Sequence, residues 1–322
     1  MSAQHNAGDR EYGKRRGEFS PPERDERRLG AVPDRYRERT SRWAAADLTP
    51  YLDGTYRRPR ATIGRLRSDR QAMLYAGKDH IIYGPTGSGK TMLALALCAD
   101  IICDPEDSTA LYVHFEEPDA MDAVDRLRHV YTVPDEPIME RFRFVSPVAA
   151  ARGWEIDDLA EDEHRLVVLD GVNEAMTLFG RGEGFGSDNW SRFRQAVIMP
   201  FLRAGSAVVC LDHVTKADSD APLPMNSVQK INAATGVAYY LRPHEDADAD
   251  HRGCSWVLIS KDRPGSVKRS GIRREGRRGM APFTYWGAMI TDVRAPNSNP
   301  LWIAPPRQSH LDVMDGGSDE DF

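Results

Sequence analysis

The chain has 322 residues, of which 29% are charged and 40% are hydrophobic, and its net charge is −6. This balance is typical of a globular protein with one large domain or two small ones. No apolar run approaches the about 20 residues that a membrane-spanning helix needs, and residues 1–19 lack the apolar core of an export signal. These features argue against a membrane protein, and we expect a cytoplasmic chain.

The two ends differ in composition from the middle of the chain. Residues 1–42 are polar and rich in arginine, and 311–322 carry five acidic residues and no basic one. We therefore predict a disordered arm over 1–42 and a disordered acidic tail over 307–322. The arm is either a plain solvated tail or a weak nucleic-acid-binding segment. Residues 43–79 regain Trp, Tyr and Leu and are predicted to form an ordered lead-in that packs on the core.

From residue 80, short apolar runs alternate with helical patterns. The apolar runs cover 80–84, 110–115, 141–145, 165–170 and 206–212, and the helical patterns cover 91–102, 118–131 and 189–205. Unbroken runs of Val, Ile and Leu indicate strands that are buried on both faces. The sequence therefore predicts an α/β fold over 80–306, with a mostly parallel central sheet. Further runs between 237 and 304 predict antiparallel strands at one edge of the sheet, on the C-terminal side.

One segment between a predicted strand and a predicted helix fits the pattern G-x-x-x-x-G-K-[ST]. Its residues are Gly84, Pro85, Thr86, Gly87, Ser88, Gly89, Lys90 and Thr91. Glycines let successive backbone N–H groups turn toward phosphate oxygens, and the N-terminus of the following helix adds positive charge. In this pattern Lys90 reaches the β- and γ-phosphates and the Thr91 hydroxyl binds Mg²⁺. We therefore expect ATP and Mg²⁺ as ligands.

Three carboxylates follow other predicted strands. Asp170 ends the run 165–170, where it is placed to hold Mg²⁺ together with Thr91, although a helix cap is the alternative. Glu116 and Glu117 follow the run 110–115. One of them is expected to be the base that activates water, and the other an N-cap. We favour Glu116, but the sequence alone does not decide between the two.

From about residue 47 to 270 the chain resembles the RecA-like P-loop ATPases, and within them the hexameric replicative helicases of the RepA type. It is also similar to ATPases of that branch encoded by phages of actinobacteria. The stretches GPTGSGKT, YVHFEEPDA, RLVVLDG, VVCLDHVTK and ISKDRPGSV carry the resemblance. It implies that Glu116 is the catalytic glutamate, that His213 senses the γ-phosphate, and that Lys261 and Arg263 enter the site of a neighbouring subunit. For His213 the alternative is an ordinary hydrogen-bonded histidine. For Lys261 and Arg263 the alternative is a surface turn.

The resemblance also implies two loops that grip single-stranded DNA, at 171–190 and 214–230. Their expected DNA contacts are Arg181, Lys216 and Lys230, although two aspartates in the second loop would repel DNA. The expected protein is thus a ring-forming, hexameric DNA helicase of replication, in the bacterial host cytoplasm if it is phage-encoded. A recombination or loader ATPase without unwinding activity and a regulatory switch are the alternatives. The acidic end with Phe322 resembles tails that dock on replication proteins, and a solubility tail is its alternative.

Overall fold

The computed structural model describes residues 45–106, 108–180, 187–214, 227–245, 252–275, 282–292 and 300–314. The chain divides into two compact units, with the boundary between Arg57 and Arg58. The described part of the smaller unit contains the short helix α1 (Thr49–Leu52), near which the rings of Tyr51 and Tyr56 stack with centroids 4.5 Å apart. The predicted arm over 1–42 lies outside the described residues.

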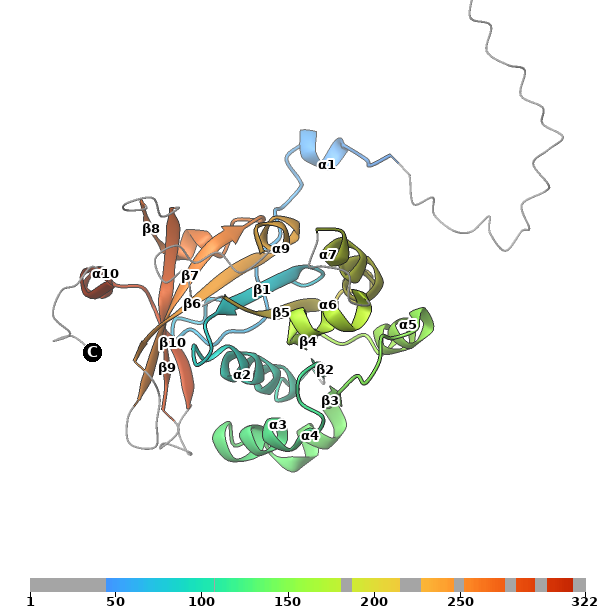
Figure 1. Ribbon diagram of the computed structural model, residues 1–322. Coiled ribbons are helices and arrows are strands. Elements are labelled where there is room, and N and C mark those ends of the chain that lie inside the picture. Colours follow the sequence, from blue (N-terminus) through green and yellow to red (C-terminus); the bar gives the residue numbers. More distant parts are fainter. Residues whose placement is uncertain are drawn as a thin grey trace, which may run out of the picture. The chain divides into compact units, whose positions relative to one another are not determined.

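The larger unit is organised around one sheet of ten strands (Figure 1). The strands are β1 (Asp79–Gly84), β2 (Ala110–His114), β3 (Phe142–Val145), β4 (Leu166–Asp170), β5 (Ala207–His213), β6 (Val237–Glu245), β7 (Gly253–Asp262), β8 (Ile272–Arg274), β9 (Phe283–Thr291) and β10 (Leu301–Ala304). Their order is β10-β9-β7-β6-β1-β5-β4-β2-β3, with β8 paired to β9. The pairs among β1 to β6 are parallel, and those that involve β7 to β10 are antiparallel. The predicted fold class is confirmed.

Helices cover both faces of the parallel strands. The helical segments after α1 are α2 (Lys90–Ile102), α3 (Met121–Asp125), η2 (Arg126–Val130), α4 (Asp135–Arg141), α5 (Gly153–Glu161), α6 (Val172–Gly180), α7 (Ser187–Phe193), η3 (Arg194–Ile198), α8 (Met199–Arg203), α9 (Ser227–Ala233), η4 (Lys268–Ser270) and α10 (Gln308–Met314). Because side chains alternate along a strand, Ile82 packs with α2 in one buried cluster, whereas Ile81 and Tyr83 join the cluster that contains α7 and α8. Figure 1 shows α2 and α6 on opposite sides of the sheet. This double cover explains the unbroken apolar runs.

Two predicted helices are interrupted. The pattern over 118–131 forms α3 followed by the π-helical turn η2, and the pattern over 189–205 forms α7, the π-helical turn η3 and α8. Pro200 lies in the first turn of α8 and has no N–H to donate to the preceding turn. The regular ladder is therefore broken next to η3, as is common where a proline enters a helix.

The predicted lead-in and tail are both partly described. Residues 58–79 belong to the larger unit, where Ile63, Met73 and Leu74 are buried. The expectation of disorder from residue 307 onward is wrong for 308–314, which form α10. Its His310 hydrogen bonds to the Tyr285 hydroxyl at 2.6 Å, and burial of apolar side chains on this turn of helix stabilises it. Residues 315–322 lie outside the described part. None of the helices in the described ranges has both the length and the apolar character needed to cross a bilayer.

Candidate nucleotide and catalytic site

The segment between β1 and α2 has the backbone of a phosphate-binding loop. Gly87 and Gly89 have φ values of +82° and +81°, in the left-handed region that side chains rarely adopt. A Cβ at Gly89 would also lie 2.6 Å from the Met289 methyl group of β9, and one at Gly84 would lie 2.5 Å from a carbonyl oxygen of β6. The loop therefore needs glycine at Gly87 and Gly89 for backbone conformation, and at Gly84 for space. Its N–H groups precede the N-terminus of a 13-residue helix, which favours an anion.

Lys90 begins α2 and folds back over this loop. Its Nζ donates hydrogen bonds to the carbonyl oxygens of Gly84 at 2.9 Å and Pro85 at 2.8 Å. The residue is only 6% exposed, and this burial lowers the pKa of Lys90 to about 8, although nearby carboxylates oppose the shift. In this structure the ammonium group donates only to neutral carbonyl oxygens. A bound phosphate would give it a hydrogen-bond acceptor with full negative charge.

Thr91 and Asp170, the predicted magnesium ligands, lie side by side in the structure. Thr91 Oγ1 donates to Asp170 Oδ2 at 3.3 Å, which places a hydroxyl and a carboxylate of neighbouring elements side by side. The described residues contain no cluster of three or more His, Cys, Asp or Glu side chains that could hold a metal by themselves. Mg²⁺ bound with nucleotide needs only one or two protein oxygens, because phosphates and water complete its shell. The donor set therefore fits Mg²⁺–ATP.

Tyr112 of β2 fixes the orientation of this carboxylate. Its buried hydroxyl donates to Asp170 Oδ2 at 2.5 Å. We expect Tyr112→Phe to raise the Mg²⁺ concentration for half-maximal ATP hydrolysis by about tenfold, the usual effect of removing a partner of a metal ligand. The measurement is a Mg²⁺ titration of the hydrolysis rate at saturating ATP.

The matched control for this prediction is Tyr131→Phe. It removes a second tyrosine hydroxyl, which donates to the Met92 carbonyl at 2.6 Å rather than to a site carboxylate. Equal Mg²⁺ requirements in the two variants would contradict the orienting role of Tyr112.

Glu116 lies at the same edge of the sheet as Asp170. His114 Nδ1 accepts the backbone N–H groups of Glu116 at 3.2 Å and Glu117 at 3.1 Å, which leaves the ring Nε2 facing Asp170 Oδ2 at 3.7 Å. Gly171, with φ +83°, lets the Glu116 side chain lie against the backbone that follows Asp170, because a Cβ there would be 3.0 Å from it. These contacts bring the Glu116 carboxylate to the edge where the predicted magnesium ligands lie.

His213 ends β5, the strand between β1 and β4. It pairs in register with Gly84, and its Nε2 lies 3.9 Å from Glu116 Oε1. Burial and the charge of Lys90 lower the pKa of His213, which favours the neutral ring. The structure thus places this predicted sensor between the phosphate loop and the predicted base.

Burial and a hydrogen bond with Glu174 raise the pKa of Glu116 to about 7. A base works as the carboxylate, so activity is present above pH 7 and is lost as the pH falls. Lys90 binds phosphate as the ammonium ion, so activity is lost again as the pH rises through about 8. We therefore expect a narrow, bell-shaped profile of kcat/KM for ATP, which reports the free enzyme.

Two variants assign the limbs of this profile. Glu174→Gln should move the acid limb to lower pH, since it removes a negative charge and a competing carboxyl group. In Glu116→Gln, ATP affinity should fall as the pH rises above about 8, because Lys90 is intact. It should not fall at acid pH, because the group assigned to the acid limb is absent. An acid limb that stays in place in Glu174→Gln would contradict its assignment to Glu116.

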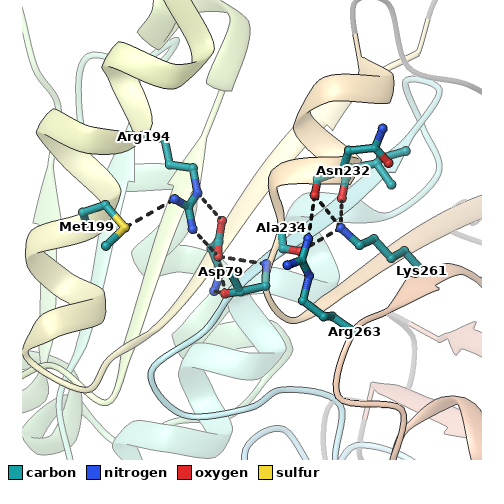
Figure 2. Close-up of polar contacts among 9 residues, drawn as sticks. Asp79, Arg194, Met199, Asn232, Ala234, Lys261 and Arg263 are labelled. Carbon is teal, nitrogen blue, oxygen red and sulfur yellow. Dashed lines mark hydrogen bonds and ion pairs between the residues drawn. The ribbon is translucent and has the colours of Figure 1, made fainter. Parts of the chain in front are cut away.

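Lys261 and Arg263 lie at the other edge of the sheet, where the parallel strands begin (Figure 2). Arg263 N donates to the carbonyl of Gly236, whose own N–H donates to the Asp79 carbonyl at the start of β1. The six residues of β1 separate this edge from the phosphate loop by about 17 Å. The pair is therefore remote from the phosphate loop of its own chain.

A buried ion pair occupies the same edge. Arg194 Nε and Nη2 donate to Asp79 at 2.9 and 3.0 Å (Figure 2). Burial would raise the pKa of Asp79, but hydrogen bonds from Arg194 and Thr235 hold it below its ordinary value. The ion pair thus anchors Asp79, whose backbone is connected through Gly236 to the backbone of Arg263.

The predicted DNA contacts fare differently. Lys230 is wrong as a contact in this structure, because its ammonium group is buried and paired with Asp212 Oδ2 at 2.9 Å. Arg181 and Lys216 lie outside the described residues. The first predicted DNA loop, 171–190, is helical over 172–180, where Phe179 packs edge-on against Phe193 with ring centroids 5.5 Å apart.

Sequence reasoning missed several side chains of the site. Tyr112 and His114 both face Asp170, and their alternation on one strand is a signal that becomes useful only once β2 and β4 are known to be neighbours. Glu174, which perturbs Glu116, lies one turn after Asp170 on α6. The sequence shows that Glu174 lies one helical turn beyond the predicted metal ligand Asp170. It does not show that Glu174 lies next to Glu116, because that depends on the order of the strands.

Comparison with known proteins bears on this site. A family model described as "AAA domain" matches residues 58–219, just over half of the chain and including the phosphate loop, Glu116, Asp170 and His213. No curated protein matches the chain. The geometry and the match agree on nucleotide binding and ATP hydrolysis as the activity of the domain. The chain belongs to the AAA domain family, within the AAA/RecA-like P-loop ATPases.

Proposed function

We propose that this ATPase assembles as a ring, and that hydrolysis of ATP between its subunits moves the ring along single-stranded DNA, as in a replicative helicase. Lys90 and the loop glycines bind the phosphates, and Thr91 with Asp170 holds Mg²⁺, which neutralises charge on the phosphates. Glu116 accepts a proton from the attacking water. Lys261 and Arg263 of the adjacent subunit complete the site.

The observation that carries the proposal is the separation of two sets of functional residues. The phosphate loop, Asp170 and Glu116 lie where the parallel strands end, whereas Lys261 and Arg263 lie where β1 begins. A cation that stabilises the transferring phosphoryl group must touch it. The pair can do so only in a second copy of the chain, so that hydrolysis depends on assembly.

The DNA part of the proposal is supported by the elements that leave the site. α6 begins two residues after Asp170 and forms part of the first segment predicted to bind DNA, 171–190, and β5 ends at His213, immediately before the second. Both segments start at groups that face the nucleotide. A change at the phosphates therefore has a short covalent path to each segment expected to bind DNA.

The experiment is the rate of ATP hydrolysis with and without single-stranded DNA, at low salt because phosphate contacts weaken steeply as salt rises. We expect DNA to stimulate the rate, and Arg263→Ala to abolish the stimulation. An unchanged rate would contradict DNA-driven motion and favour an ATP-dependent switch. Displacement of a strand from a duplex with a 5′ tail then separates a helicase from a loader that binds DNA without unwinding it.

A further inference from the structure

Helix α9 makes two sets of contacts that connect the two edges of the sheet. Lys230 lies in the middle of the helix, and its side chain contacts Asp212 and Asn173, which are close in sequence to His213 and Asp170. The carbonyl groups at and just beyond its C-terminal end contact Lys261 and Arg263. The helix is only seven residues long, so a shift of one set of contacts displaces the other.

The first set is a closed network of three polar side chains, of which Lys230 and Asp212 are buried and Asn173 is partly buried. Lys230 Nζ donates to Asp212 Oδ2 at 2.9 Å and to Asn173 Oδ1 at 2.7 Å, and Asn173 Nδ2 donates to Asp212 Oδ1 at 3.0 Å. The side chains of Lys230 and Asp212 are 2% and 1% exposed. Asp212 immediately precedes His213, and Asn173 follows Asp170 by three residues. The ammonium group therefore joins α9 to both polypeptide segments that bear site residues.

The second set holds the tips of the predicted trans-acting pair (Figure 2). Lys261 Nζ donates to the carbonyls of Ile231 and Asn232, both at 2.7 Å, and of Ala234 at 2.9 Å. An ammonium group has three N–H donors, and these carbonyls use all of them. Arg263 Nη2 donates to the Asn232 carbonyl at 3.0 Å. The end of α9 therefore determines where both cations lie.

The backbone that carries the pair is held independently. Asp262, between the two cations, accepts hydrogen bonds from the Tyr75 hydroxyl and from the backbone N–H groups of Gly265 and Lys268, at 2.8–2.9 Å. The base of the turn is thus fixed to the core. Only the long side chains can be redirected, and the carbonyl groups that direct them belong to α9 and to Ala234, which follows it.

We propose that Lys230 is a positioning residue which, by anchoring α9 to Asp212 and Asn173, holds Lys261 and Arg263 in place for the nucleotide site of the adjacent copy. This inference rests on the proposed function, in which the pair acts in trans. The Lys230 ammonium group is buried against Asp212 and Asn173, so its proposed role is indirect. Its anchor makes α9 the physical link between the site of one subunit and the site that the same subunit completes in its neighbour.

The test uses mixed assemblies of the full chain. We expect Lys230→Met alone to lower ATP turnover by about tenfold or more, the usual range for loss of a supporting contact, while ATP affinity stays within about twofold. Mixing it with Lys90→Ala should restore turnover above the sum of the separate proteins. In the mixture one subunit supplies an intact phosphate loop and the other supplies a correctly held pair.

Arg263→Ala mixed with Lys90→Ala is the reference. If that mixture fails to recover activity, the trans-acting pair of the proposed function is wrong. If it recovers but Lys230→Met with Lys90→Ala does not, the loss lies in the subunit's own site and the positioning role of Lys230 is overturned. Lys78 is a partly buried lysine outside this network, and Lys78→Met controls for the substitution.

A second variant guards against misfolding, because Lys230→Met leaves the Asp212 carboxylate buried without its partner. Lys230→Met/Asp212→Asn removes both charges and is mixed with Lys90→Ala in the same way. Recovery in the mixture supports the inference, and activity of the double variant equal to that of the unmodified protein contradicts it.

Discussion

Glu116→Gln is expected to lower the rate of ATP hydrolysis by about 10³-fold while ATP still binds, because an amide of the same shape cannot accept a proton from water. This loss corresponds to about 4 kcal/mol of transition-state stabilisation. The structure places the carboxylate 3.9 Å from His213 Nε2 and against the backbone that follows Asp170. The measurement is single-turnover hydrolysis with saturating Mg²⁺–ATP, together with a direct measurement of ATP affinity.

Glu117→Gln is the matched control, since it makes the same chemical change at the adjacent position. Glu117 is exposed, and its carbonyl accepts a hydrogen bond from the Ser146 hydroxyl at 2.7 Å. We expect its substitution to change the rate by less than about threefold, as for a surface residue outside the site. A larger loss in Glu117→Gln than in Glu116→Gln would reverse the choice of base that the geometry favours.

The parts of the site that could be predicted from sequence are those built from one short segment. The phosphate loop from Gly84 to Thr91 can be identified from the order of its own residues. Asp170 can be identified because it ends a run typical of a buried strand. Contacts between segments could not be predicted in this way. The Tyr112 hydroxyl reaches Asp170 because β2 lies next to β4, and the order of strands in a sheet is not written in any local pattern.

Lys230 and α10 illustrate the same limit. A lysine in a polar segment is usually exposed, and its burial here depends on Asp212 from β5 and Asn173 from α6. The segment over 308–314 is short and precedes an acidic end, so that it resembles the tail by composition. It is helical because Leu311 is buried in the larger unit and His310 bonds to Tyr285 of β9. In both cases tertiary contacts override a local pattern.

Arg263→Ala is expected to lower turnover by about 10³-fold, the lower end of the effect of an arginine that acts on a transferring phosphoryl group. ATP affinity should change little, since the phosphate loop and Asp170 lie at the opposite edge of the sheet. The measurement is steady-state hydrolysis at a protein concentration that saturates assembly, with the oligomeric state recorded in parallel. Arg263→Lys should recover only part of the rate, because an ammonium group cannot reproduce the planar fork of donors.

The competing explanation for Arg263 is purely structural, because its guanidinium donates to the Asn232 carbonyl at the end of α9. That contact is a single exposed hydrogen bond at a helix C-terminus, worth about 1 kcal/mol or less. If this were its whole role, Arg263→Ala would lower the melting temperature slightly and leave turnover nearly unchanged. Lys261→Ala should differ, because it removes three hydrogen bonds and so loses stability as well as turnover. A large loss of turnover with an unchanged melting temperature in Arg263→Ala therefore separates the catalytic role from the cap.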